Sequence, residues 1–82
     1  MFEILISNPA QKDFDGLQKM MHERVVGVLE RIRINPFRYL KKLVGTDFYR
    51  LRVGDYRIII SIEGNKITVL KVAHRKNIYE GL

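Results

Sequence analysis

Residues 48–73 read FYRLRVGDYRIIISIEGNKITVLKVA, and this stretch decides the fold. Apolar and polar residues alternate along it with the period of two that a half-buried β-strand imposes. Gly54-Asp55 and Gly64-Asn65 interrupt the alternation, and a glycine at the start of a two-residue loop favours a tight hairpin turn. The stretch therefore predicts three antiparallel strands at residues 48–53, 56–63 and 66–73.

The two turns also determine which side chains share a face of this meander. One face is apolar and must be covered by the rest of the chain: Tyr49, Leu51, Val53, Tyr56, Ile58, Ile60, Ile62, Ile67 and Val69. The other face mixes cations with polar and apolar groups: Arg50, Arg52, Arg57, Ser61, Glu63, Lys66, Thr68, Ile59, Leu70 and Val72. The same alternation predicts that His74 lies on this second face.

The N-terminal half is expected to cover the apolar face of the meander. Residues 2–7 read as a short strand, and Asn8-Pro9 predicts the start of a helix capped by Asn8 and ended near Gly16. A second helix is expected over 17–34, because five apolar residues recur there at three- and four-residue spacing: Met21, Val25, Val28, Leu29 and Ile32.

A basic connector follows at residues 37–44, where Tyr39, Leu40 and Leu43 are expected to pack inward. The length of 82 residues leaves room for one domain only. The sequence thus predicts a single α+β domain of residues 1–82. In it, an N-terminal strand and a helix hairpin pack on one face of a twisted antiparallel sheet that ends in the three-stranded meander.

Composition narrows the class of function. The absence of cysteine excludes a disulfide scaffold, a cysteine nucleophile and a cysteine zinc site, and the two histidines lack metal-ligand spacing, so no metal or cofactor is expected. No apolar run approaches the roughly 20 residues of a membrane span and no signal peptide is visible, which predicts a cytoplasmic protein without a membrane partner. Fifteen Lys and Arg against nine Asp and Glu give a net charge of +6, which favours an anionic partner.

Three arginines converge on the second face of the predicted meander. Arg52 is expected directly opposite Arg57, with Arg50 two residues away on the same face. Like charges in opposite positions destabilise a sheet by roughly 0.2–1 kcal/mol per pair. One interpretation is a solvated face whose arginines extend into water. The other is an anion site, because the planar guanidinium grips phosphate through two parallel hydrogen bonds. The absence of a carboxylate between them favours the anion site.

More cations and two aromatic groups flank this cluster. The connector adds Arg38, Lys41 and Lys42, and the segment after the last strand adds Arg75 and Lys76. His74 is either a structural residue or part of the site. Tyr79 is either core filler or a platform on which a nucleobase stacks.

The order of elements and two strings in the C-terminal half resemble the RelE/ParE superfamily of toxins from toxin–antitoxin modules. The strings are YRLRVGDYR at 49–57 and HRKNIY at 74–79. The resemblance implies a RelE-like fold and a metal-independent endoribonuclease that cleaves mRNA in the ribosomal A site, where a 2′-OH attacks the adjacent phosphate. It also implies a cognate acidic, RelB-like antitoxin protein that binds the toxin in a hetero-oligomer.

The resemblance assigns roles by position. Arg50 and Arg52 take the places of two basic residues on the first meander strand, and Arg57 takes that of an arginine that stabilises the transition state. Arg75 matches the basic residue after the last strand, and Tyr79 matches a tyrosine near the C-terminus.

The sequence departs from the RelE pattern at one point. RelE-type enzymes often carry lysines where this chain has Arg50 and Arg52, and an arginine that stays protonated is a poor general base. These two arginines are therefore expected to hold phosphate, and proton transfer passes to His74 or Tyr79. RNA phosphate is also expected to contact Arg38, Lys41, Lys42 and Lys76.

Two alternatives stay open within the superfamily. A ParE-like toxin would inhibit DNA gyrase by binding and cleave no RNA, and a non-catalytic member would only bind its antitoxin or RNA. The presence of Arg57, Arg75 and Tyr79 favours the ribonuclease.

Overall fold

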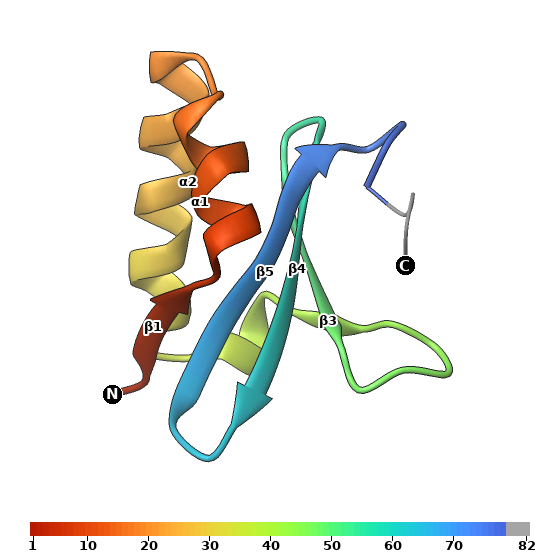
Figure 1. Ribbon diagram of the computed structural model, residues 1–82. Coiled ribbons are helices and arrows are strands. Elements are labelled where there is room, and N and C mark those ends of the chain that lie inside the picture. The colour runs from red at the N-terminus through yellow and green to blue at the C-terminus, as the bar shows by residue number, and fades with distance from the viewer. Residues whose placement is uncertain (79–82) are drawn as a thin grey trace.

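The predicted meander forms the centre of the sheet in a computed structural model that describes residues 1–78 (Figure 1). Its strands are β3 (Tyr49–Val53), β4 (Tyr56–Glu63) and β5 (Lys66–His74), each antiparallel to the next. Gly54 and Gly64 begin the two tight turns with φ of +58°, a backbone conformation that glycine adopts without strain. The three strands and both turns are confirmed.

Two short strands complete the sheet. β1 (Glu3–Ile6) lies parallel to β5, and β2 (Lys41–Lys42) lies antiparallel to β3, so the order is β1-β5-β4-β3-β2. The sheet is therefore antiparallel except for the parallel pair β1–β5 at one edge. The strand β2 falls within the segment that was expected to be only a connector.

Both predicted helices form, and they lie side by side on one face of the sheet (Figure 1). They are α1 (Asn8–Asp15) and α2 (Lys19–Ile32), followed by a single 3₁₀ turn, η1 (Pro36–Arg38). The expected cap of α1 was wrong by one residue: the Ser7 hydroxyl, and not Asn8, accepts a hydrogen bond from the Ala10 N–H at 3.2 Å. Ser7 lies in extended backbone geometry, which directs its oxygen at that free N–H.

The core lies between the helices and the sheet. Its buried members are Ala10, Phe14, Val25, Leu29, Ile32, Leu40, Leu51, Val53, Ile58, Ile60, Ile67, Val69 and Val72. The apolar face and the helix stripe therefore meet as expected. Tyr39 does not join them: Leu40 takes the inward position, and Tyr39 is 40% exposed. The expectation that Tyr39 packs inward was wrong.

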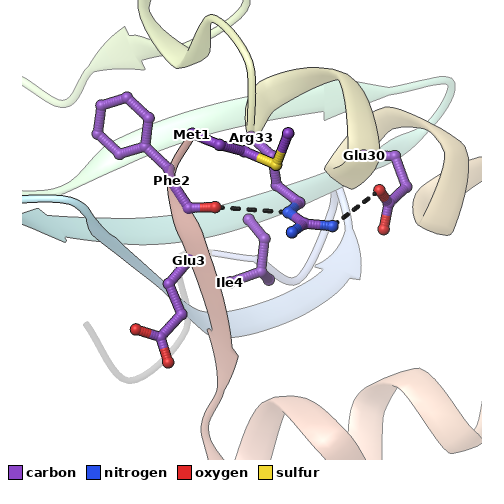
Figure 2. A pocket seen from close by; sticks show the side chains of 6 residues that line it. All are labelled: Met1, Phe2, Glu3, Ile4, Glu30 and Arg33. Carbon is purple, nitrogen blue, oxygen red and sulfur yellow. Dashed lines mark hydrogen bonds and ion pairs between the residues drawn. The ribbon is translucent and has the colours of Figure 1, made fainter.

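The start of β1 is held against the end of α2. The Phe2 N–H donates to the Arg33 carbonyl at 2.9 Å, and the Arg33 Nε donates back to the Phe2 carbonyl at 3.4 Å. Figure 2 shows the Arg33 guanidinium between that carbonyl and the Glu30 carboxylate, with which it forms an ion pair at 3.1 Å. The depression beside them, about 470 Å³, borders the N-terminal residues and α2. These contacts fix the helix layer over the β1 edge.

Within residues 1–78, no helix combines the length and apolar character needed to cross a membrane.

Candidate functional site

A β-bulge in β5 determines which side chains form the site. From the Gly64 turn the pairing with β4 runs regularly as far as Ile60 opposite Val69. The next pair joins Ile59 to Lys71, so Leu70 is an extra residue in β5. Because side chains alternate along a strand, one extra residue reverses the face on which every later side chain of β5 lies.

This reversal corrects two expectations. Val72 pairs with Ile58 and belongs to the helix-side core, whereas unbroken alternation placed it on the arginine face. His74 pairs with Tyr56, and the two rings meet edge to face with centroids 5.6 Å apart. His74 therefore shares the helix-side face with Tyr56, and its expected place on the arginine face was wrong.

The face opposite the helices carries the cations in two rows that run across the strands. Strand register places Lys41, Arg50, Ile59 and Lys71 in one row. The adjacent row contains Arg52, Arg57 and Ala73. We call the five cations of these two rows, Lys41, Arg50, Arg52, Arg57 and Lys71, the cationic face. The predicted convergence of the three arginines is confirmed.

Hydrogen bonds orient Arg57 within the cationic face. Its Nη1 donates to the Gly54 carbonyl at 2.8 Å and to the Tyr56 carbonyl at 2.9 Å. Both acceptors belong to the backbone around the β3–β4 turn, and both bonds use the same amino group. A guanidinium held in this way is preorganised, and it has further N–H groups on Nε and Nη2 with which to meet an anion.

An apolar side chain lies among these cations. Ile59 is 0% exposed although it lies on the face opposite the helices, outside the helix-side core. Ile78 is also 0% exposed and also lies outside that core. Figure 1 shows the chain after β5 turning away from the helices. Apolar cover strengthens electrostatic interactions because it excludes water.

The segment after β5 lies beside the β3–β4 turn. The Arg75 N–H donates to the Asp55 carbonyl at 2.8 Å, which confirms that this segment leaves the sheet near Asp55. The Lys76 N–H donates to His74 Nδ1 at 3.2 Å. The exposed side chains of Arg75 and Lys76 are thus brought to the end of the sheet where Arg57 lies.

The structure separates other predicted site residues from the cationic face. Lys42 pairs with Tyr49, whose face is the one covered by the helices. Arg38 lies on η1, which packs against α2, and its guanidinium is 5.9 Å from the centre of the Tyr39 ring. Tyr79 lies outside the described residues.

Two cations near the site were not predicted. The bulge brings Lys71 to the cationic face, and a signal for it exists in the sequence: apolar positions shift from Ile67 and Val69 to Leu70 and Val72. The other is Arg24 of α2, whose guanidinium lies against the β3–β4 turn. No local pattern of the sequence indicates that contact, because it joins the helix to a turn distant in the chain.

Replacing Gly54 by alanine is expected to destabilise the protein by about 1–2 kcal/mol. The residue has φ of +58°, and a Cβ there would lie 3.1 Å from Arg24 Nη1. Urea denaturation measures the change. Gly27→Ala is the matched control, since a Cβ at that helix position meets nothing within 4 Å, and it should stabilise by about 0.5–1 kcal/mol. A Gly54→Ala variant as stable as the parent would contradict this view of the turn.

Among residues 1–78, no three His, Asp or Glu side chains gather in a way that could hold a metal ion. The chemistry available to the described residues is that of cations at a partly covered sheet face.

Comparisons with known proteins place the chain in a family. Residues 4–79 match the family of ParE toxins of type II toxin–antitoxin systems. The chain is 31% identical to Toxin RelE3 of Methanocaldococcus jannaschii, over 95% of this chain and 96% of that protein.

Solved structures of toxin–antitoxin complexes have the same fold. A chain of the RelB–RelE antitoxin–toxin complex from Methanococcus jannaschii superposes with a TM-score of 0.78 at 30% identity, covering 95% of this chain and 98% of that one. A chain of the archaeal RelE–RelB complex from Pyrococcus horikoshii superposes with a TM-score of 0.79 at 29% identity, covering 90% and 94%. The chain therefore belongs to the RelE/ParE superfamily, as a RelE-family toxin of a type II toxin–antitoxin system.

Proposed function

We propose that this toxin is an endoribonuclease that cleaves mRNA on the ribosome without a metal ion. In the proposed reaction the 2′-OH of one nucleotide attacks the adjacent phosphate, the bond to the 5′-oxygen breaks, and a cyclic phosphate and a free 5′-OH result. The cationic face carries this proposal, because five cations on three neighbouring strands and one edge strand form a surface suited to RNA phosphate.

The cations have distinct proposed roles. The attacked phosphorus gathers negative charge on its oxygens as the fifth bond forms, and fixed donors stabilise that charge. Arg57 is assigned this role because backbone carbonyls already hold its guanidinium. Arg50, Arg52 and Lys41 hold the flanking phosphates, and Arg75 approaches from the turn after β5.

Proton transfer requires groups other than the arginines. The attacking 2′-OH must lose a proton and the leaving 5′-oxygen must gain one. His74 lies on the helix-side face, where its Nδ1 accepts from the Lys76 N–H, so we assign it a positioning role for the turn that carries Arg75 and Lys76. Tyr79 remains the proposed proton-transfer group.

The shape of the site supports a requirement for the ribosome. The cationic face is one side of an open sheet, and none of its five cations lines the depression of about 610 Å³ that borders Asp47, Glu63 and Leu70. A strand of RNA on such a face is held from one side only. We propose that the ribosome presents the mRNA to this surface and supplies the opposing wall.

We also propose an acidic antitoxin as the partner in a hetero-oligomer. Two related solved structures are RelB–RelE complexes, and the net charge of +6 favours an acidic protein. We expect the toxin, expressed with its chromosomal neighbour, to co-purify with a small acidic protein that relieves growth inhibition. Full toxicity in the presence of that neighbour would contradict the proposal.

A cell-free translation extract tests the enzymatic proposal. Primer extension on mRNA after addition of the toxin should reveal cuts within codons, which depend on translation. A gyrase supercoiling assay run in parallel should show no inhibition. Intact mRNA together with inhibited gyrase would instead identify a ParE-type activity.

A further inference from the structure

We propose that Lys71 binds RNA phosphate, and that the RNA backbone crosses the strands along the row of Lys41, Arg50 and Lys71. The inference rests on the proposed ribonuclease function and extends it to a residue and a direction of binding.

The bulge in β5 determines the face on which Lys71 lies. Without the extra residue Leu70, regular pairing would place Lys71 opposite Ile58, which is 0% exposed in the helix-side core. An ammonium group directed into that layer would lose its hydration. With the bulge, Lys71 pairs instead with Ile59 on the cationic face and is half-buried there.

The spacing of the row suits an extended polyanion. Adjacent strands lie about 4.8 Å apart, so Arg50 and Lys71 flank Ile59 with Cα atoms about 10 Å apart, and the row from Lys41 to Lys71 is about 14 Å long. No residue of this row is a carboxylate. The buried Ile59 forms an apolar floor between the two inner cations.

A path along the central strand β4 is disfavoured by charge. Along β4 the side chains on this face are Arg57, Ile59, Ser61 and Glu63, so a path in that direction ends at a carboxylate. A path across the strands meets cations at β2, β3 and β5. The RNA backbone is therefore expected to run across the sheet.

The chemistry of lysine suits a positioning contact. Its flexible stem carries a compact charge that can follow a phosphate, whereas Arg57 presents a fixed fork. A contact of this kind fixes the register of the RNA without reading its sequence.

The salt dependence of RNA binding tests the inference. The probe is a single-stranded 2′-O-methyl RNA oligonucleotide, which lacks the attacking hydroxyl and so is not cleaved. The slope of log affinity against log salt is negative, and each lost phosphate contact reduces its magnitude by about 0.7 for a single strand. Lys71→Ala and Lys41→Ala should each reduce the magnitude of the slope by about 0.7, and the double variant should reduce it by about 1.4. Lys71→Arg should keep the parental slope.

Two further variants separate binding from folding. Lys71→Met removes the charge but keeps an apolar side chain of similar length. If this variant is as stable as the parent and its salt dependence is reduced, the weaker binding results from the lost charge and not from a folding defect. Lys66→Ala is the matched control, because it removes the same charge from the first residue of β5, which lies opposite Glu63 and outside the two cationic rows, and its slope should equal that of the parent.

The outcomes are distinguishable. If the parent binds the oligonucleotide with a steep salt dependence and cleaves mRNA, but both Lys71→Ala and Lys71→Met keep the parental slope, the inference is wrong and the proposed function stands. If the parent neither binds the oligonucleotide nor cleaves mRNA, the proposed function itself fails.

Discussion

Replacement of Arg57 by alanine is expected to lower mRNA cleavage by about 100- to 1,000-fold, the range found when one preorganised donor to a transition-state charge is removed. Arg57 is fixed by two hydrogen bonds to backbone carbonyls and lies directly opposite Arg52. In the proposed reaction, its loss removes a fixed charge where the phosphorus becomes five-coordinate. Primer extension gives the cleavage rate, and growth inhibition should fall with it.

Two controls make this result specific. Arg57→Lys keeps the charge without the planar fork, so its rate should lie between those of the parent and the alanine variant. Arg31→Ala removes an equal charge from the exposed surface of α2 and should cleave as the parent does. Equal cleavage by the parent and by folded Arg57→Ala would show that Arg57 does not stabilise the transition state.

Replacement of Ile59 by alanine is expected to destabilise the protein by about 2–5 kcal/mol, as for other large buried aliphatic side chains. Ile59 is fully buried, although its face is the one without helices. In a domain of 82 residues this loss is a large share of the total stability. Urea denaturation followed by circular dichroism measures the change.

The prediction distinguishes a covered site from a solvated sheet face. Val44→Ala is the control, because Val44 is fully exposed and its truncation should change stability by no more than about 0.5 kcal/mol. If Ile59→Ala behaved like this control, the centre of the cationic face would be open to water, and the apolar floor assigned to it would not exist.

The meander could be predicted because its signals are local. Each hairpin is defined by a glycine at the start of a two-residue turn, and alternation then sorts the side chains. Arg52 lies two residues before Gly54 and Arg57 lies two residues after Asp55, so their pairing follows from the turn alone. The arginine cluster was therefore visible without the structure.

The rest depended on non-local packing. The bulge at Leu70 reversed the faces of Val72 and His74, and only the shift in apolar positions along β5 hinted at it. Pairing with β3 made a strand of Lys41–Lys42, which is too short to show alternation. The contact between Arg24 and the turn at Gly54 joins two segments that are distant in the chain, and neither segment carries a local sequence pattern that indicates it.

The central claim is that RNA binds the sheet face opposite the helices. Amide NMR spectra recorded while the 2′-O-methyl RNA oligonucleotide is added test it most directly. We expect chemical-shift changes concentrated in β3, β4 and β5, at Arg50, Arg52, Arg57 and Lys71 and their neighbours. Changes confined to α1 and α2, or spectra that do not change at all, would contradict it.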